Sequence, residues 1–261
     1  MIPLPNPPKL VKKEGNKAVF EIEGLYPGYG ATIGNSLRRV LLSSLQGSAV
    51  TQMKIKGVSH EFSTIPGVEE DVITLMLNLK ALRFRVFSDE PQTARTRVKG
   101  ERKILSSDFE LPSQVELIND DCHIATLTAK SSELDMEITI EKGIGYSPRE
   151  GRKKEKMEIG VVPLDAIFTP VQRVSFKVEN MRVGERTDFD KLFLEIETDG
   201  TLTPETALSQ SSEILVKHFS LLTETFKEEI SAPKTSETEI GEVKKKKTAA
   251  TKKKGKKTKK K

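Results

Sequence analysis

The sequence contains very few of the residues from which disulfides and metal centres are built. Its 261 residues include a single cysteine, Cys122, three histidines and no tryptophan. One thiol cannot form a disulfide framework or a cysteine metal site, and so little cysteine is typical of a reducing compartment. The three histidines, His60, His123 and His218, lie far apart in the sequence. We interpret each as an ordinary surface or half-buried residue.

Long apolar runs are also missing. No stretch of about 18 consecutive apolar residues occurs, so the sequence predicts no membrane-spanning helix. The first fifteen residues are rich in proline and then basic, without the apolar core of a secretory signal, and we expect them to form an irregular lead-in. Together with the single cysteine, these features predict a cytoplasmic protein.

Positive charge is concentrated at one end of the chain. Residues 244–261 contain twelve lysines and no acidic residue, whereas the whole chain has a formal net charge of +5. Residues 1–243 are therefore mildly acidic, with −7 on the same count. We expect an acidic folded body, a polar linker over 231–243 and a disordered lysine-rich tail over 244–261.

Hydrophobic periodicity places helices toward both ends of the body and strands between them. Helical spacing of apolar residues predicts helices over about 30–45, 69–82 and 201–230. Period-two alternation predicts strands at 17–25, at 49–58, in short segments within 83–145 and in two long segments after Pro170. This order favours an α+β protein in which the two chain ends form one domain and a mostly antiparallel β module is inserted between them.

Residues 26–45, YPGYGATIGNSLRRVLLSSL, run from a glycine-rich turn directly into an apolar helix. A phosphate-binding loop at this place would indicate an enzyme. The dinucleotide fingerprint requires G-x-G-x-x-G, but Ile33 occupies the third glycine position after Gly28 and Gly30. A Walker loop requires Lys and then Ser or Thr after its last glycine, and Gly34 is followed by Asn35. Neither pattern is complete, so we interpret the turn as a packing element.

The helix after this turn has a wide apolar arc. The residues on the arc are Ile33, Leu37, Val40, Leu41, Leu42 and Leu45. Arg38 projects within the arc and Arg39 lies at its edge, whereas an amphipathic helix usually keeps its charges on the opposite face. An arginine tolerates such a place because its weakly hydrated, planar guanidinium can bind carboxylates or backbone carbonyl groups. The alternative is a surface arginine whose stem lies along apolar chain.

The last predicted helix carries a short heptad seam. Its members, spaced by four, three and four residues, are Leu215, Phe219, Leu222 and Phe226. A core helix within one domain and a helix at an interface explain this spacing equally well. Most homo-oligomers are two-fold dimers, so a seam across a dimer axis stays open as an interpretation.

Four blocks of the sequence, taken together, are more specific than any single motif. They are GATIGNSLRRVLLSSLQGSAVT at 30–51, GVSHEFSTIPGVEEDVITLMLNLKAL at 57–82, GIGYSP at 143–148, and the stretch from TPVQRVSFKVENMRV to TLTPETAL at 169–208. In order and spacing, from about residue 9 to 230, the chain resembles the N-terminal region of bacterial-type RNA polymerase alpha subunits. The resemblance implies a two-part α+β fold, with a dimerisation domain from 1–46 and 170–230 and an inserted, mostly antiparallel β domain at 47–169.

The resemblance also implies a role in assembly. Alpha subunits of this family form a homodimer on which the polymerase is built, one protomer binding the beta subunit and the other the beta-prime subunit. By position, Arg38, Arg39 and Leu42 would face beta, and Lys80 and Leu164 would face beta-prime. The dimer would be held by Ile33, Leu37, Leu41, Leu215, Phe219, Leu222 and Phe226. The chain would then belong to the transcription complex of a bacterial nucleoid, in the cytoplasm.

Catalysis is not expected from this chain. The resemblance implies that it is a non-catalytic subunit of a nucleotidyltransferase and holds no cofactor, since magnesium and zinc are expected only in the large subunits. The nearest acidic pair, Asp188 and Asp190, lacks the third carboxylate of an Asp-x-Asp-x-Asp cluster. We expect this pair to cap a turn or to bind an arginine.

The sequence departs from the family after residue 230. Many alpha subunits continue into a small domain that binds promoter DNA and activators, and here we expect only the linker and the lysine tail. The tail would bind DNA phosphates without sequence preference, or it is a solubilising extension with no defined partner. A rival from another class is a stand-alone dimeric nucleic-acid-binding protein that acts through the tail. The acidic body argues against this rival, because such proteins usually keep basic residues on a folded face.

Overall fold

The computed structural model describes residues 2–151 and 160–231, and only the backbone of 226–231. The predicted tail and almost all of the predicted linker therefore lie outside the described residues. The chain forms two units, residues 1–216 and the residues from Lys217 onward, and each is described by itself. Within the described residues, no helix is both long enough and apolar enough to cross a membrane.

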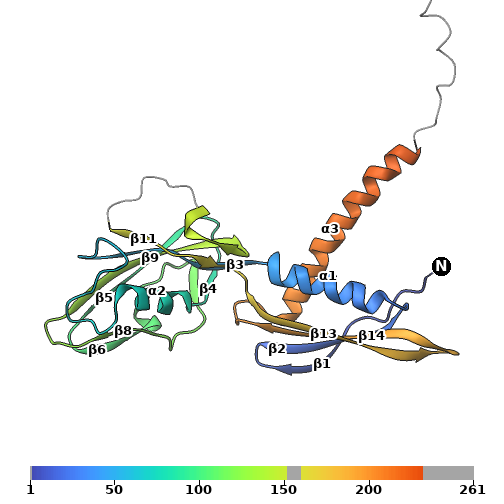
Figure 1. Ribbon diagram of the computed structural model, residues 1–261, viewed down its shortest axis with the longest axis horizontal. Coiled ribbons are helices and arrows are strands. Elements are labelled where there is room, and N and C mark those ends of the chain that lie inside the picture. Colours follow the sequence, from blue (N-terminus) through green and yellow to red (C-terminus); the bar gives the residue numbers. More distant parts are fainter. Residues whose placement is uncertain (1, 152–159, 232–261) are drawn as a thin grey trace, which may run out of the picture. The chain divides into compact units, whose positions relative to one another are not determined.

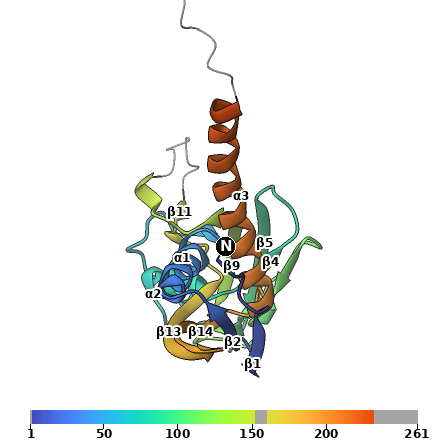
Figure 2. The ribbon, with the colours of Figure 1, turned by 90° about the vertical axis from the view of Figure 1, so that its right-hand side faces the viewer.

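The first sheet combines strands from both ends of the chain, in the order β1–β2–β14–β13. Its strands are β1 (Lys9–Glu14), β2 (Lys17–Leu25), β13 (Val171–Val183) and β14 (Arg186–Thr198). In Figure 1 the blue N-terminal strands lie beside the orange C-terminal pair, and Figure 2 shows the four strands side by side. Helix α1 (Tyr29–Ser43) packs on this sheet against β13 and β14.

Two glycines let α1 approach the sheet closely. A Cβ atom at Gly34 would lie 2.7 Å from the ring of Phe176 and 3.0 Å from Leu192. One at Gly30 would lie 3.0 Å from Asp190. We call the apolar cluster between helix and sheet the α1 core; its buried members include Phe20, Leu37, Leu41, Leu45, Val174, Leu194, Ile196 and Ala207.

The second sheet has the order β11–β3–β9–β5. Its strands are β3 (Gln46–Ile55), β5 (Gln92–Lys99), β9 (Glu133–Ile144) and β11 (Val161–Pro163). Three two-stranded ribbons accompany it: β4 (Phe84–Val86) with β7 (Val115–Leu117), β6 (Arg102–Leu105) with β8 (His123–Leu127), and β10 (Tyr146–Ser147) with β12 (Ala166–Ile167). Every pairing between named strands in the described residues is antiparallel.

Helix α2 (Val72–Lys80) contacts β3 and β8 and buries Val72, Leu75 and Leu79. These side chains belong to a second apolar cluster, which we call the α2 core. Its members run in sequence from Val50 to Leu164 and do not overlap with those of the α1 core. Short 3₁₀ turns at Ser106–Asp108 and Arg149–Gly151 complete this part of the chain.

Helix α3 (Pro204–Ser231) begins at the predicted place. Thr203 is its N-cap, since the Thr206 amide donates to the Thr203 hydroxyl oxygen over 3.3 Å. Ala207 is buried in the α1 core. In the second unit the helix is exposed, with Phe219 at 60% and Leu222 at 57% exposure.

The α+β class and the mostly antiparallel strands are confirmed, but some predicted bounds are wrong. The lead-in contains β1, which pairs with β2 through its backbone while all six of its side chains are exposed. Helix α2 begins at 72 rather than 69, because Asp71 caps it by accepting from the Thr74 amide over 2.8 Å. Strand β3 covers 46–55 rather than 49–58. The domain boundaries at 46/47 and 169/170 stay predictions.

Candidate assembly surfaces

The N-terminus of α1 is already occupied by a carboxylate of the chain itself. The amides of Gly28 and Gly30 each donate to Asp190 Oδ2 over 2.9 Å, and Asp190 is 7% exposed. Gly28 adopts φ +84°, a left-handed conformation that favours glycine. A helix N-terminus binds anions through its free amides and its dipole, and here Asp190 is that anion. The glycine turn is therefore a cap and packing element, not a phosphate loop.

Asp188, two residues earlier, binds an arginine. Its Oδ2 lies 2.6 Å from Nη2 of Arg186, and this pair is half exposed. Hydrogen bonding by Arg186 is the largest effect on the Asp188 carboxyl and lowers its pKa. Within the described part of the chain, no group of three or more His, Cys, Asp or Glu side chains is placed to hold a metal ion.

The two arginines of α1 lie on its outer face. Arg38 and Arg39 are exposed, while Leu42, predicted to lie with them toward beta, is half-buried against the α1 core. Within the described part of the chain, neither guanidinium forms an ion pair or a side-chain hydrogen bond. These arginines are thus available to a partner, and their role at a beta-subunit interface stays a prediction.

An exposed apolar patch lies at the C-terminal end of α1. It consists of Ile144, Tyr146 and Ile167, which are 59%, 61% and 53% exposed, and Tyr146 pairs directly with Ile167 across β10 and β12. Thr169 Oγ1 donates to the carbonyl oxygen of Leu42 over 3.4 Å, which ties this region to the helix. Sequence reasoning missed the patch, although its signal was present as the apolar residues of the GIGYSP block.

Lys80, the last residue of α2, forms an ion pair with Asp165. Its Nζ lies 3.1 Å from Asp165 Oδ2, and both side chains are about one-third exposed. The pKa of Asp165 is lowered, first by the hydrogen bond from the Arg149 backbone amide and then by that from Lys80. Leu164, the other residue predicted to face beta-prime, is fully buried in the α2 core. In this chain Leu164 anchors the position of Asp165, and the interface role of both predicted residues stays a prediction.

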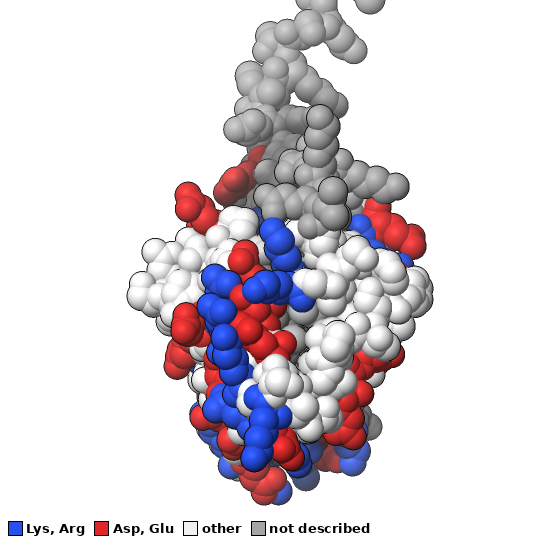
Figure 3. Space-filling model, turned by 90° about the vertical axis from the view of Figure 1, so that its left-hand side faces the viewer, with Lys and Arg blue, Asp and Glu red and all other residues white. Residues whose placement is uncertain are grey.

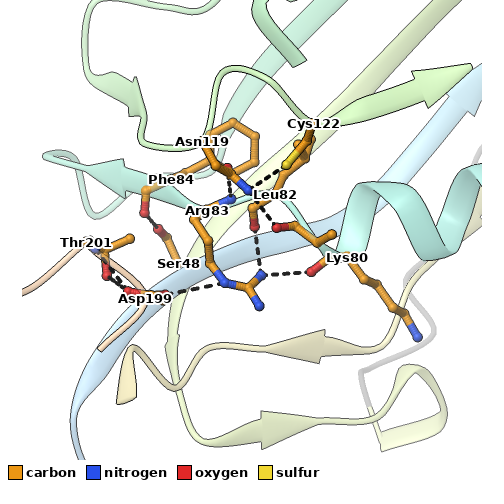
Figure 4. Close-up of polar contacts among 10 residues, drawn as sticks. Ser48, Lys80, Leu82, Arg83, Phe84, Asn119, Cys122, Asp199 and Thr201 are labelled. Atoms are coloured by element: carbon orange, nitrogen blue, oxygen red, sulfur yellow. Dashed lines mark hydrogen bonds and ion pairs between the residues drawn. The ribbon is translucent and has the colours of Figure 1, made fainter. Parts of the chain in front are cut away.

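The carbonyl end of α2 is also bound by a polar network, shown in Figure 4. Arg83 Nη1 donates to the carbonyl oxygens of Lys80 and Leu82 over 2.8 Å and 3.0 Å. The backbone amide of Arg83 donates to Asn119 Oδ1 over 2.8 Å, and Asn119 Nδ2 donates to Cys122 Sγ over 2.9 Å. This network fixes the main chain on the C-terminal side of Lys80.

Acidic and basic side chains are interleaved on the surface. Figure 3 shows a band of lysine and arginine with aspartate and glutamate among them. A groove of about 570 Å³ beside β3, β5 and β9 also contains both signs of charge: Lys54, Lys56, Arg95 and Arg97 line it together with Asp135 and Glu137. Arg95 Nη2 lies 2.9 Å from Asp135 Oδ2, and this hydrogen-bonded arginine is the main cause of the lowered pKa of Asp135. Arg97 is likewise paired, with Glu133 over 2.8 Å, so both arginines of the groove are engaged by carboxylates of the chain itself.

The residues predicted to form the dimer fall into two groups. Leu37 and Leu41 are buried beneath α1 against the chain's own sheet, and Ile33 and Leu215 are half-buried at that core. Phe219 and Leu222 are exposed, as are their neighbours Val216 and Leu221. The side chain of Phe226 lies outside the described residues. Helical spacing alone could not separate these groups, and the dimer contacts stay a prediction.

Comparison with known proteins identifies the family. The family model described as RNA polymerase Rpb3/RpoA insert domain matches residues 53–169. The DNA-directed RNA polymerase subunit alpha of Alkaliphilus oremlandii (strain OhILAs) is 50% identical over 211 residues, which are 81% of this chain and 66% of that protein. The subunit of the same name from Carboxydothermus hydrogenoformans (strain ATCC BAA-161 / DSM 6008 / Z-2901) is 49% identical over 216 residues, 82% of this chain and 69% of the relative.

A third relative has the same name and similar coverage. The alpha subunit of Oceanobacillus iheyensis (strain DSM 14371 / CIP 107618 / JCM 11309 / KCTC 3954 / HTE831) is 49% identical over 202 residues, 77% of this chain and 64% of that protein. The chain thus spans about two thirds of the length of the curated relatives that it matches. Nothing in these similarities favours a stand-alone nucleic-acid-binding protein. The chain belongs to the family of bacterial DNA-directed RNA polymerase alpha subunits.

Proposed function

We propose that this chain is an assembly scaffold: it forms a homodimer on which the beta and beta-prime subunits of a DNA-dependent RNA polymerase are joined. The observation that carries the proposal is the identity of about half the residues to alpha subunits over four fifths of the chain. The described surfaces agree with such a role, because α1 exposes Arg38 and Arg39 and α3 exposes Phe219 and Leu222.

Dimerisation is supported by exposed apolar side chains on α3. Phe219, Leu221 and Leu222 are each more than half exposed. Burying a side chain of this size in an interface contributes about 1.5–3 kcal/mol, and a two-fold axis applies the gain twice. We therefore expect the full chain to sediment as a dimer and Leu222→Asp to sediment as a monomer. Ser220→Asp is the matched control, because it adds the same charge at an exposed position of α3 that points away from Phe219 and Leu222.

Binding of the beta subunit is supported by the free arginines on α1. Co-purification of tagged chain with beta and beta-prime tests it. Arg38→Ala with Arg39→Ala should remove beta and leave the dimer intact. Arg97→Ala removes an exposed arginine that is already paired with Glu133 over 2.8 Å, and it should have no effect. Full recovery of beta by the double variant would refute the assignment to α1.

The chain is proposed to contribute no catalytic group and no metal to the polymerase. In support, Asp188 and Asp190, the acidic pair nearest to a metal-binding motif, are engaged by Arg186 and by the amides that begin α1. The test is metal analysis of the purified dimer after dialysis, with the reconstituted polymerase as the positive sample. Stoichiometric zinc or magnesium in the dimer alone would contradict the proposal.

A further inference from the structure

Two arginines that follow α2 reach across to the turn between β14 and α3. Arg83 lies in the link between α2 and β4, and Arg85 lies on β4. Both side chains contact residues 199–201, which lead from the last strand of the first sheet into α3. Their targets are thus more than one hundred residues away in sequence.

Arg83 binds both sides of this junction at once. Its Nη1 holds the carbonyl end of α2 at Lys80 and Leu82, while its Nε lies 3.5 Å from Asp199 Oδ2 (Figure 4). The Asp199 side chain is 6% exposed. Its other oxygen accepts from the amide of Thr201 over 3.0 Å, so both carboxylate oxygens are engaged. A carboxylate so little exposed is strongly disfavoured without a cationic partner, and Arg83 is that partner.

The side chain of Arg85 binds backbone carbonyl groups of the same turn. Its Nε donates to the carbonyl oxygen of Thr201 over 3.0 Å and its Nη2 to that of Gly200 over 3.4 Å. Its Nη1 donates to Glu116 Oε2 over 2.8 Å, which orients the guanidinium from the far side. On the adjacent strand, the hydroxyl of Ser48 donates to the carbonyl oxygen of Phe84.

The junction has little apolar packing of its own. The α1 core and the α2 core share no member, and an open cleft of about 270 Å³ lies beside Arg85, lined also by Gln46, Lys142 and Leu202. Two parts of a chain that meet without a large hydrophobic interface move relative to each other by default. The arginine contacts oppose such motion at the β14–α3 turn.

We propose that Arg83 and Arg85 form a clasp that fixes the α2 core on the β14–α3 turn. They act as positioning residues: they hold the Lys80 end of α2 and the start of α3 in one arrangement. The purpose of the clasp, to present a predicted docking surface and a predicted dimer helix together, rests on the proposed function. The clasp itself is a property of the protomer, and it is tested without the large subunits.

The experiment measures the distance distribution between two spin labels by pulsed electron resonance. The labels are placed at Glu14→Cys on β1 and Asp121→Cys in the β7–β8 link, both exposed, in a Cys122→Ser background of the full chain. Excess unlabelled chain suppresses distances between protomers. We expect a narrow distribution for the intact clasp and one about twofold broader for Arg83→Ala with Arg85→Ala, as for domains joined without a firm interface.

Three further variants make the result specific. Arg83→Lys keeps the charge but lacks the planar guanidinium that reaches two carbonyls and a carboxylate. Its distance distribution should therefore be broader than that of the intact clasp. Arg97→Ala removes an arginine within the second sheet and should leave it narrow. Asp199→Asn keeps the acceptor for Thr201 while removing the charge that Arg83 binds, and it should broaden the distribution even if the double alanine variant fails to fold.

Unchanged widths in the double variant and in Asp199→Asn would overturn the clasp, as would broadening by Arg97→Ala. Co-purification of beta and beta-prime with the unmodified chain tests the scaffold function separately. If beta and beta-prime do not co-purify with the unmodified chain, while the double alanine variant does broaden the distance distribution, the proposed function is rejected and the clasp is retained.

Discussion

Replacing Asp190 with alanine should destabilise the fold strongly, because one carboxylate oxygen satisfies two amides at the start of α1. Gly28 and Gly30 both donate to Oδ2, and Asp190 is nearly buried. Alanine would leave both amides without this acceptor; Gly30 is buried, so its amide is shielded from water, whereas Gly28 is exposed. The variant would also lose the favourable interaction between the negative charge of Asp190 and the positive end of the α1 dipole.

The magnitude follows from these losses. An unsatisfied buried donor costs about 1–3 kcal/mol, so the buried Gly30 amide together with the lost dipole interaction gives a loss of about 2–4 kcal/mol for Asp190→Ala. Asp190→Asn keeps an oxygen as acceptor and loses only the charge, which amounts to about 1 kcal/mol. Asp188→Ala breaks an exposed ion pair with Arg186 and should cost less than about 1 kcal/mol.

The assay is urea unfolding followed by far-ultraviolet circular dichroism, at one fixed chain concentration because dimerisation shifts apparent stability. The expected order of stability is wild type, Asp188→Ala, Asp190→Asn, Asp190→Ala. If Asp190→Ala were no less stable than Asp188→Ala, the carboxylate would not be the cap of α1, and the question of what binds this glycine turn would reopen.

Two further predictions concern a close approach on β3, in the second sheet, and a charged side chain on β2, in the first sheet. In Gly47→Ala the added methyl would lie 1.8 Å from the backbone oxygen of Phe168, so the melting temperature should fall by the equivalent of about 3 kcal/mol or more, and an unchanged value would contradict the packing. Hydrogen bonds from Lys9 and Lys191 lower the pKa of Glu23 from 4.5 to about 2, so its stabilising effect is complete above pH 4.5 and is lost as the pH falls through about 2. Glu23→Gln should therefore flatten the dependence of the urea midpoint on pH in that window, and an identical pH profile would refute the assignment.

Elements with a local signal could be predicted from the sequence. Strand β2 covers the predicted residues 17–25, and its buried positions Ala18, Phe20 and Ile22 alternate with less buried ones. Helix α3 begins where Thr203 and Pro204 predict a cap and a first turn. In contrast, β1 has no buried side chain and is defined by its pairing with β2, so its own residues carry no period.

The candidate surfaces were predictable only in part. Spacing identified the apolar positions of α1 but could not say that Leu37 and Leu41 pack on the chain's own sheet. The cap by Asp190 joins residues 160 and 162 positions apart, and no local pattern reveals such a pair. The clasp was missed for the same reason, because Arg85 finds its acceptor 116 positions later at Thr201.

The order of strands in the first sheet has a consequence for synthesis on the ribosome. Strand β2 and helix α1 leave the exit tunnel early, yet their partners β13 and β14 are made only after Leu164, the last member of the α2 core. The middle of the chain can therefore complete its core while the N-terminal segment still displays an unpaired strand edge and an uncovered apolar helix face. In a nascent chain, β2 and α1 are therefore the elements most exposed to pairing with another nascent chain on the same messenger RNA. This exposure ends when the β13–β14 hairpin pairs with β2 and packs against α1.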